Sequence, residues 1–228
     1  MALKKIALCI VGLWIVISPL VACEKAQESA PASPQAEPAY RGTIVAMGDS
    51  LTEGLGVDEE DAYPARLQKK LFQEGKRYKV VNAGISGETS SGALSRIDWV
   101  LTLEPDIVIL ETGANDGLRG IDPALTRDNI DKIIQKLHQE NVVVVLAGME
   151  MMRNLGEPFT RAFGAIYPEL AKAHDVILIP FFLEGVAGNP KLNQTDGVHP
   201  TAKGYQVVTE TVYPYVVEAI EKVERAAN

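Results

Sequence analysis

The chain has few cysteines, few histidines and fewer basic than acidic side chains. Its 228 residues include two cysteines, Cys9 and Cys23, so the chain after residue 23 has no sulfur for a disulfide or a zinc cluster. Lysine and arginine number 22 against 30 aspartate and glutamate residues, which gives a formal charge of −8 and a pI of about 5.0. Because such a charge repels a phosphate backbone, the composition argues against a nucleic-acid partner.

The three histidines are too scattered in the sequence to form a metal cluster. His138 and His174 each fall near the end of an expected helix, where the helix dipole favours a cation, and we expect both to be solvated. We therefore expect neither a metal nor a cofactor. The remaining histidine, His199, has an acid three residues before it, at Asp196.

The first 22 residues have the pattern of an export signal. Lys4 and Lys5 precede an apolar stretch at 6–20. About 15 apolar residues are short for a helix that must cross a hydrocarbon core of about 30 Å, so a membrane span is the weaker interpretation. The segment Leu20-Val21-Ala22-Cys23 resembles a bacterial lipobox, which implies that residues 1–22 are removed and that the cysteine becomes a lipidated N-terminus.

Residues 23–39 are expected to form a flexible tether that starts at lipidated Cys23. This segment is rich in alanine, proline, glutamate and serine and has almost no large apolar residue, so it cannot form a core. Glu24 is not the residue that retains a lipoprotein at the inner membrane. We therefore expect an exported, periplasmic protein that is lipid-anchored to the outer membrane, in a host with two membranes.

Residues 40–228 have the composition of one globular domain. A hydrophobic content of 46% and a charged content of 23% are typical of a protein that buries a core. From Tyr40 onward, short apolar runs rich in β-branched residues alternate with amphipathic segments, which is the pattern of a parallel sheet covered on both faces. The sequence therefore predicts a three-layer α/β/α domain with a doubly wound, five-stranded parallel sheet.

Each element of this domain can be placed from periodicity and from helix start and stop signals. Strands are predicted at 43–47, 78–82, 106–111, 142–147 and 176–180, and helices at 61–75, 91–103, 123–140, 159–174 and 200–225. The helix after Ser50 is expected to start late, because the glycine-containing segment at 53–56 must be crossed first. Ligands of such sheets bind at the carboxyl ends of the strands.

Polar clusters follow three of the predicted strands. They are Gly48-Asp49-Ser50, Gly84 to Gly87 and Gly113-Ala114-Asn115-Asp116. The segment with Asp196 and His199 precedes the last helix and can return to the same edge of the sheet. A serine needs a base to become nucleophilic, and the base needs an orienting partner, so we predict that Ser50, His199 and Asp196 act together.

Four segments together resemble the GDSL, or SGNH, hydrolases. They are Gly48–Leu51, Asn82–Thr89, Gly113–Gly120 and Asp196–Pro200. Their order and spacing are similar to the branch that contains the bacterial multifunctional thioesterase, lysophospholipase and arylesterase, and the resemblance covers about residues 44–205. It implies the flavodoxin-like SGNH fold and an esterase or thioesterase activity.

The resemblance also implies a role for each site residue. Ser50 is the nucleophile, His199 the general base and acid, and Asp196 the carboxylate that orients the imidazole. The oxyanion hole is assigned to the backbone N–H of Ser50, the backbone N–H of Gly87 and the side-chain amide of Asn115. A glycine lets its backbone approach the substrate closely, and an amide donates a hydrogen bond without adding a charge.

Two acids and three serines near these segments have simpler interpretations. We expect Asp49 and Asp116 to brace the loops that carry the nucleophile and the oxyanion amide, although Asp49 is also a candidate base. Turn or cap positions are expected for Ser86, Ser90 and Ser91 rather than nucleophilic roles.

Apolar side chains after the fourth predicted strand are candidates for substrate binding. Met149, Met151, Met152 and Leu155 lie either in the core or in a wall for an acyl or aryl group, and both interpretations stay open. Leu118 belongs to a segment with glycines at both ends that can move as a flap, and we expect it to contact the substrate.

These observations predict a hydrolase that cleaves carboxylic esters or thioesters of medium to long acyl, or aryl, groups. A carbohydrate O-deacetylase is the first alternative, although methionine and leucine are poor sugar platforms. A non-catalytic lipoprotein that binds acylated ligands is the second, but it predicts the loss of a catalytic residue, and none is missing. A structural envelope protein leaves the four segments unexplained. The expected partners are a small-molecule ester and, through the lipid, a membrane; we expect a monomer.

Overall fold

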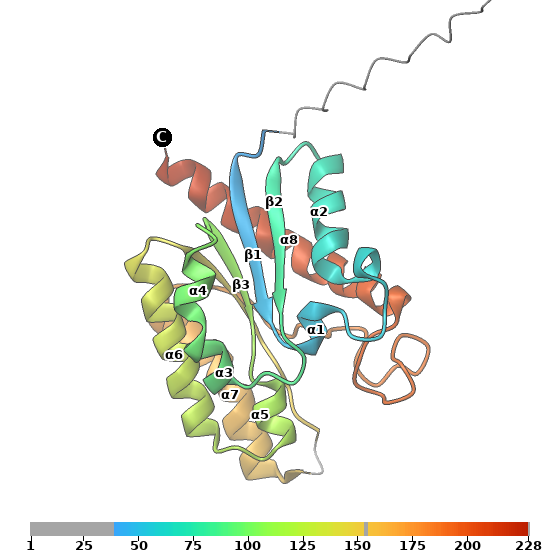
Figure 1. Cartoon of the computed structure of the whole chain (residues 1–228). Helices are drawn as coiled ribbons and strands as arrows, with labels where there is room; N and C mark the ends of the chain where they lie inside the picture. Colours follow the sequence, from blue (N-terminus) through green and yellow to red (C-terminus); the bar gives the residue numbers. More distant parts are fainter. Residues whose placement is uncertain (1–38, 153–154, 228) are drawn as a thin grey trace, which may run out of the picture. The chain divides into compact units, whose positions relative to one another are not determined.

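The computed structural model describes residues 39–152 and 155–227 (Figure 1). The predicted signal sequence at 1–22, the predicted lipidation site at Cys23 and all but the last residue of the predicted tether lie outside the described residues. Within the described ranges, none of the helices combines the length and the apolar character that crossing a bilayer requires.

Five parallel strands form the sheet in the order β2-β1-β3-β4-β5. The strands are β1 (Gly42–Gly48), β2 (Tyr78–Gly84), β3 (Ile107–Glu111), β4 (Val143–Ala147) and β5 (Ile177–Ile179). The chain turns outward from β1 to β2 and then crosses to the other side of β1, so the strand order reverses between β1 and β3. The predicted fold class is confirmed.

Helices cover both faces of the sheet, which explains why the strands are apolar on both sides. The long helices are α2 (Tyr63–Gln73), α6 (Pro123–Gln139), α7 (Glu157–His174) and α8 (Ala202–Ala226), and the short ones are α1 (Ser50–Glu53), the 3₁₀ turn η1 (Glu59–Asp61), α3 (Ser90–Ser95), α4 (Ile97–Leu101) and α5 (Ala114–Leu118). Helices α2 and α8 pack on one face, whereas α3, α4, α6 and α7 pack on the other (Figure 1).

The centre of the core is formed by β1 and β3. Residues 44–47 of β1 and 107–110 of β3 are each completely buried. Ile44 pairs with Val80 on one side and with Ile107 on the other, so β1 is hydrogen-bonded along both edges. The carboxyl end of β1 is therefore fixed by the sheet, and the residues that follow it start from a rigid position.

The helix predicted at 91–103 is in fact two short helices, α3 and α4, which meet at Arg96. Arg96 has φ −111° and ψ 8°, so it leaves the helical conformation. Its guanidinium donates to both carboxylate oxygens of Glu88, at 2.7 and 2.6 Å, and to the carbonyl of Gly48. These buried contacts outweigh the continuation of a regular helix.

The expectation of a late helix after Ser50 is wrong. Helix α1 begins at Ser50 itself, because the Asp49 side chain caps it by accepting the N–H of Leu51 at 2.9 Å. The helix ends after one turn at Gly54, which adopts a left-handed conformation with φ +91°. The glycine-containing segment thus ends a helix that has already formed, and the long helix α2 starts only at Tyr63.

Candidate active site

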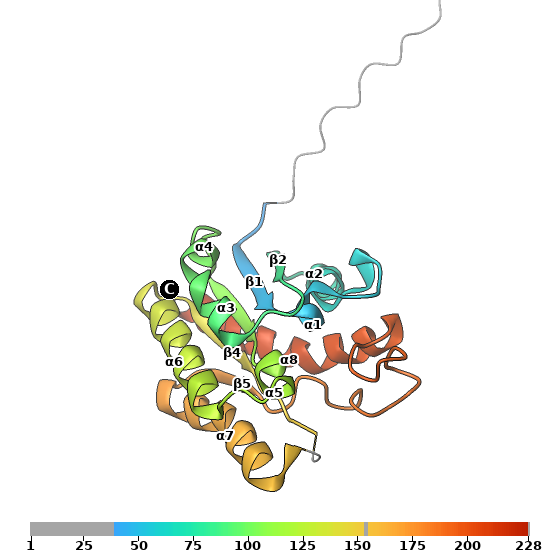
Figure 2. The same ribbon diagram turned by 60° about the horizontal axis from the view of Figure 1, so that its bottom comes forward.

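The carboxyl ends of three strands bring the predicted polar clusters together. Ser50 follows β1, Gly87 follows β2 and Asn115 follows β3, and these strands are neighbours in the sheet. Figure 2 brings this end of the sheet forward, with α1 and α5 at its edge. The clusters thus meet beside the point where the strand order reverses, which is where open parallel sheets bind ligands.

Ser50, His199 and Asp196 form one chain of hydrogen bonds. The Ser50 Oγ lies 2.8 Å from His199 Nε2, and His199 Nδ1 lies 2.7 Å from Asp196 Oδ2. Asp196 Oδ1 also accepts the N–H groups of Val198 and His199, at 2.9 and 3.0 Å. These backbone bonds, followed by the bond from the His199 side chain, lower the pKa of Asp196 to about 2. A base oriented by an ionised carboxylate is thus in place beside a serine hydroxyl.

The loop that carries His199 is held from both sides by two amide side chains. Asn193 Nδ2 donates to the carbonyls of Val186 and Asn189, at 2.6 and 2.9 Å. The Gln194 side chain donates from Nε2 to the carbonyl of Leu55 at 2.7 Å. The backbone N–H of Gln194 donates to the carbonyl of His199. These bonds connect the loop to the segment after α1, so the base and the nucleophile share one support.

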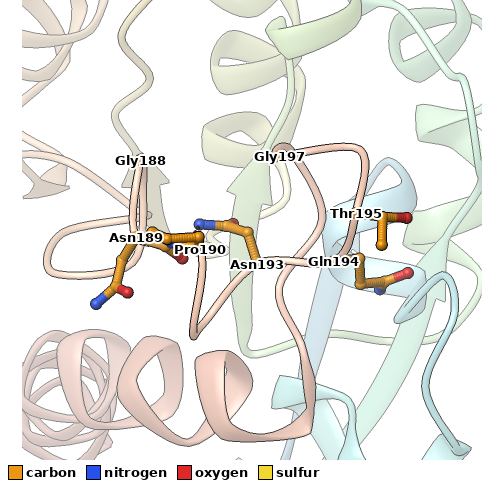
Figure 3. A pocket seen from close by; sticks show the side chains of 7 residues that line it. All are labelled: Gly188, Asn189, Pro190, Asn193, Gln194, Thr195 and Gly197. Carbon is orange, nitrogen blue, oxygen red and sulfur yellow. Dashed lines mark hydrogen bonds between the residues drawn. The ribbon is translucent and has the colours of Figure 1, made fainter.

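The same loop encloses a hollow of about 390 Å³ (Figure 3). Its lining residues are Gly188, Asn189, Pro190, Asn193, Gln194, Thr195 and Gly197. In Figure 3 the Asn193 side chain points toward Asn189, which agrees with its hydrogen bond to that residue's carbonyl. The predicted nucleophile, base and orienting acid do not line this hollow, so it lies beside the site rather than in it.

The three residues predicted as oxyanion donors, Ser50, Gly87 and Asn115, line a single cavity of about 220 Å³ together with His199. Neither Ser50 nor Gly87 uses its backbone N–H in a hydrogen bond with another described residue. Gly87 has φ +76°, a conformation that favours glycine, and its carbonyl accepts from Arg119 Nη2 at 2.7 Å. The two backbone donors are therefore available to a ligand in this cavity.

The Asn115 side chain is fixed by Asp49. Its Nδ2 donates to Asp49 Oδ2 at 2.9 Å, which leaves the second amide hydrogen for a substrate oxygen. Asp49 is 1% exposed and also caps α1, so the predicted bracing role agrees with its contacts. Burial raises the pKa of Asp49, whereas its hydrogen bonds lower it. Asp116 accepts from Ser90 and Thr126, and it thereby joins α5 to α3 and α6.

Glu111, the last residue of β3, was not predicted as part of the site. Its side chain is completely buried, and its Oε2 accepts the N–H of Asp49 at 3.1 Å and the hydroxyl of Thr52 at 2.9 Å. Burial, followed by the negative charge of Asp49, raises the pKa of Glu111 well above its ordinary value. The available signal was an acid at the end of an otherwise apolar strand.

A second cavity of about 220 Å³ shares part of its wall with the first. Both are lined by Leu51, Ala114, Leu118 and Val198, and the second is otherwise lined mainly by apolar side chains. Those side chains are Met149, Met151, Met152, Phe181, Leu183 and Ala187, with Glu150, Gly188 and Gly197 completing the wall.

Four of the five predicted substrate-binding residues thus line a cavity next to the nucleophile. The fifth, Leu155, does not line it. Met149 is 3% exposed and belongs to both the core and the wall, whereas Met152 is 56% exposed. The methionines therefore range from a core residue, Met149, to an exposed residue of the cavity wall, Met152.

The other two histidines lie away from this site, near the amino ends of β4 and β5. His138 is exposed, as predicted. The expectation for His174 is wrong in part, because its Nε2 lies 2.6 Å from Asp131 Oδ1 and it is mostly buried. In the described part of the chain, no group of three or more acid, histidine or cysteine side chains is arranged to hold a metal ion.

Comparison with known proteins identifies a family and several relatives that are esterases or thioesterases by name. The model of the GDSL-like lipase/acylhydrolase family matches residues 46–207. Esterase TesA of Pseudomonas aeruginosa is 41% identical over 75% of this chain and 86% of its own length. The thioesterase 1/protease 1/lysophospholipase L1 of Escherichia coli K12 is 40% identical over 69% of this chain and 75% of its own length. The crystal structure of TesA superposes with a TM-score of 0.75 at 40% identity, covering 78% of this chain and 99% of that one.

Proposed function

This chain belongs to the GDSL-like lipase/acylhydrolase family and is a serine hydrolase of carboxylic esters, and we propose that Ser50, His199 and Asp196 carry out its reaction. The observation that carries the proposal is the continuous hydrogen-bond chain from the Ser50 hydroxyl through the imidazole to a carboxylate. The same arrangement converts a serine into a nucleophile in unrelated folds.

The first half of the reaction forms an acyl-enzyme. His199 Nε2 takes the proton of Ser50 while Oγ attacks the ester or thioester carbonyl, and the electron pair of the carbonyl moves to its oxygen. When the tetrahedral intermediate collapses, the bond to the leaving alcohol, phenol or thiol breaks. The imidazolium gives its proton to that group, and Asp196 stabilises the imidazolium in the meantime.

The oxyanion is stabilised by donors whose positions are set before the substrate binds. We propose the backbone N–H groups of Ser50 and Gly87 and the free amide hydrogen of Asn115 as these donors, because all three residues line the cavity at the nucleophile. Removal of one such donor typically costs about 3–4 kcal/mol of barrier. Water then attacks the acyl-enzyme, again with His199 as the base, and releases the acid.

The apolar cavity supports a proposal on the substrate. A wall of leucine, methionine and phenylalanine next to Ser50 fits a medium to long acyl chain or an aryl group better than it fits a sugar. The relatives named arylesterase, in Vibrio mimicus, at 35% identity, and thioesterase/lysophospholipase, in E. coli, support the same substrate classes.

The test is a series of p-nitrophenyl esters from acetate to palmitate, assayed with the purified chain and with Ser50→Ala. We expect the rate to vanish in the variant and to peak at medium or long chains in the unsubstituted protein. Leu118→Asp, at the junction of the two cavities, should shift the preference toward short esters. Activity on acetate alone would point to a deacetylase, and a chain that binds acyl ligands without turnover would be the non-catalytic lipoprotein.

We further propose that the protein is exported and carries lipid on Cys23, with residues 1–22 removed and residues 23–39 as a tether. The support is the sequence Leu20-Val21-Ala22-Cys23 and the composition of the segment after it. The proposed location is the periplasmic face of the outer membrane, where a monomer would be held by its acyl chains. Labelling of cells with a palmitate analogue should mark the protein, and Cys23→Ser should abolish the label; an unlabelled protein with Cys23 intact contradicts the proposal.

A further inference from the structure

Glu111 is buried next to the turn that carries Ser50, and its carboxyl group forms no ion pair with any cationic side chain in the described part of the chain. Its side chain is completely buried, and the interactions that act on it come from Asp49 and Thr52. The other titratable groups that interact with it are the hydroxyls of Tyr63 on α2, Tyr167 on α7 and Tyr205 on α8. An unpaired carboxylate in such surroundings is very costly, so the group is expected to keep its proton.

The two oxygens of Glu111 have different surroundings. Oε2 accepts the backbone N–H of Asp49 and the hydroxyl of Thr52, whereas Oε1 accepts no hydrogen bond. An ionised carboxylate would leave Oε1 buried without a donor, but a carboxylic acid can carry its proton there and donate it. Oε1 is therefore the natural place for a proton.

The carboxyl group next to Glu111 is that of Asp49, whose backbone N–H donates to Glu111 Oε2 at 3.1 Å. Two adjoining carboxyl groups that are both buried cannot both be ionised at low cost, so the pair is expected to hold one proton. Burial raises the pKa of both groups, but the Asp49 carboxylate accepts from Leu51 and Asn115, whereas Glu111 Oε1 has no donor, so the proton is assigned to Glu111. Asp49 then remains an acceptor for Leu51 and Asn115.

The position of the pair connects it to the catalytic groups. Asp49 precedes the nucleophile, caps α1 and holds the Asn115 amide, while Thr52 lies in the same turn of helix. A Cβ atom at Gly48 would collide with the Glu111 carboxyl group and with the Thr52 hydroxyl. The glycine at the end of β1 thus leaves the space that the Glu111 carboxyl group occupies.

We propose that Glu111 is a positioning residue that acts as a neutral carboxylic acid, sharing one proton with Asp49 so that the pair fixes both the Ser50 turn and the Asn115 amide. The inference rests on the proposed function of Ser50 and Asn115, but the protonation of the pair does not. It adds a support to the site that neither touches the substrate nor transfers a proton to it.

The test compares Glu111→Gln with Glu111→Ala in the full chain. The glutamine amide is neutral, can donate to Asp49 and can accept from Thr52. The kcat of Glu111→Gln on p-nitrophenyl butyrate should therefore be at least ten times that of Glu111→Ala, with little difference in KM. If the glutamine variant folds and is as slow as the alanine variant, the neutral-acid assignment is overturned.

A second measurement decides the proposal even where the alanine variant does not fold. Urea unfolding is followed from pH 5 to pH 8 for the unsubstituted chain, for Glu111→Gln and for Glu169→Gln, an exposed carboxyl on α7 that serves as the control. Native Glu111 retains a proton that the unfolded chain releases above about pH 4.3, so the unfolding constant of the unsubstituted chain should rise by up to about tenfold per pH unit relative to Glu111→Gln.

The outcomes separate the two proposals. Parallel pH dependences for the unsubstituted chain and Glu111→Gln would overturn the neutral acid, whatever the activity. Turnover that persists in Ser50→Ala would overturn the proposed function, while the unfolding comparison would still report on Glu111.

Discussion

Three carboxyl groups of the site differ because their surroundings differ. Asp196 has a side chain that is 46% exposed and accepts three hydrogen bonds, two of them from backbone N–H groups, so its negative charge is stabilised. Asp49 is buried but also has donors on its carboxylate, while Glu111 is buried with one oxygen that accepts no bond. We thus propose that the same functional group orients a base at Asp196, holds an amide at Asp49 and supplies a neutral support at Glu111.

Asp196→Asn should change how stability depends on pH at the acid end. Since the folded pKa of Asp196 is about 2, below the ordinary value of about 3.9, its contribution is present above pH 4 and is lost as the pH falls toward 2. Urea unfolding at pH 5, 4, 3 and 2 should show a steeper loss for the unsubstituted chain than for the variant. Equal slopes would mean that the hydrogen bonds to Asp196 do not persist in solution.

Asn115→Ala should lower kcat by about 10²–10³ with a smaller change in KM, because the amide acts on charge that develops in the transition state. Steady-state kinetics on p-nitrophenyl butyrate checks this, with Asn189→Ala as the matched control, because the Asn189 side chain lines neither of the two cavities at Ser50. Near-normal turnover in Asn115→Ala would remove this residue from the oxyanion hole.

Much of the site could be predicted at the level of single residues. Ser50, His199 and Asp196 were predicted from chemistry and from the segments that surround them, and the structure places them in hydrogen-bonding contact. Glu111 could not be predicted as a partner of Asp49, because the contact arises only when two neighbouring strands end side by side. Leu155 was included for its place in the sequence alone, and it does not line the cavity.

At the scale of elements, the segment between β2 and α3 contains Gly87 and is held in place by a buried ion pair. Glu88 follows Gly87, and its carboxylate is held by Arg96 at the junction of α3 and α4; the two side chains are only 7% and 12% exposed. Arg96 also donates to the carbonyl of Gly48 at 3.3 Å, so one side chain connects this segment to the end of β1.

Arg96→Ala should therefore cost both stability and activity. It leaves the buried carboxylate of Glu88 without a partner, which typically destabilises a protein by about 3–5 kcal/mol, and it frees the segment that positions the Gly87 N–H. The additional change Glu88→Ala should recover part of the stability but not of kcat. Arg161→Ala, which breaks an exposed pair with Glu157, is the control and should cost less than about 1 kcal/mol in urea unfolding.

Strands and long helices were predicted to within a few residues, whereas short elements were not. The strands are apolar runs between turn signals, and this pattern survives in the fold because both faces of the sheet are covered. The break at Arg96 and the early start of α1 depend on the side chains of Arg96 and Asp49, whose partners lie elsewhere in the chain. Periodicity alone cannot predict such tertiary contacts.

At the scale of the whole molecule, the groups that form the site come from different parts of the chain. The proposed nucleophile and two proposed oxyanion donors follow the neighbouring strands β1, β2 and β3, while the proposed base comes from the loop before α8, at the other end of the domain sequence. The apolar cavity is closed by the segments after β4 and β5. The proposed nucleophile and the apolar wall are thus supplied by different strands of one sheet edge.

The central claim, that Ser50 is the nucleophile, is tested most directly by reaction with a p-nitrophenyl phosphonate ester followed by intact mass and peptide mapping. We predict a single adduct on Ser50, and no adduct on Ser50→Ala or, on the same time scale, on His199→Ala. An adduct on Ser86, Ser90 or Ser91, or esterase activity that persists in a chain fully modified elsewhere, would contradict the account.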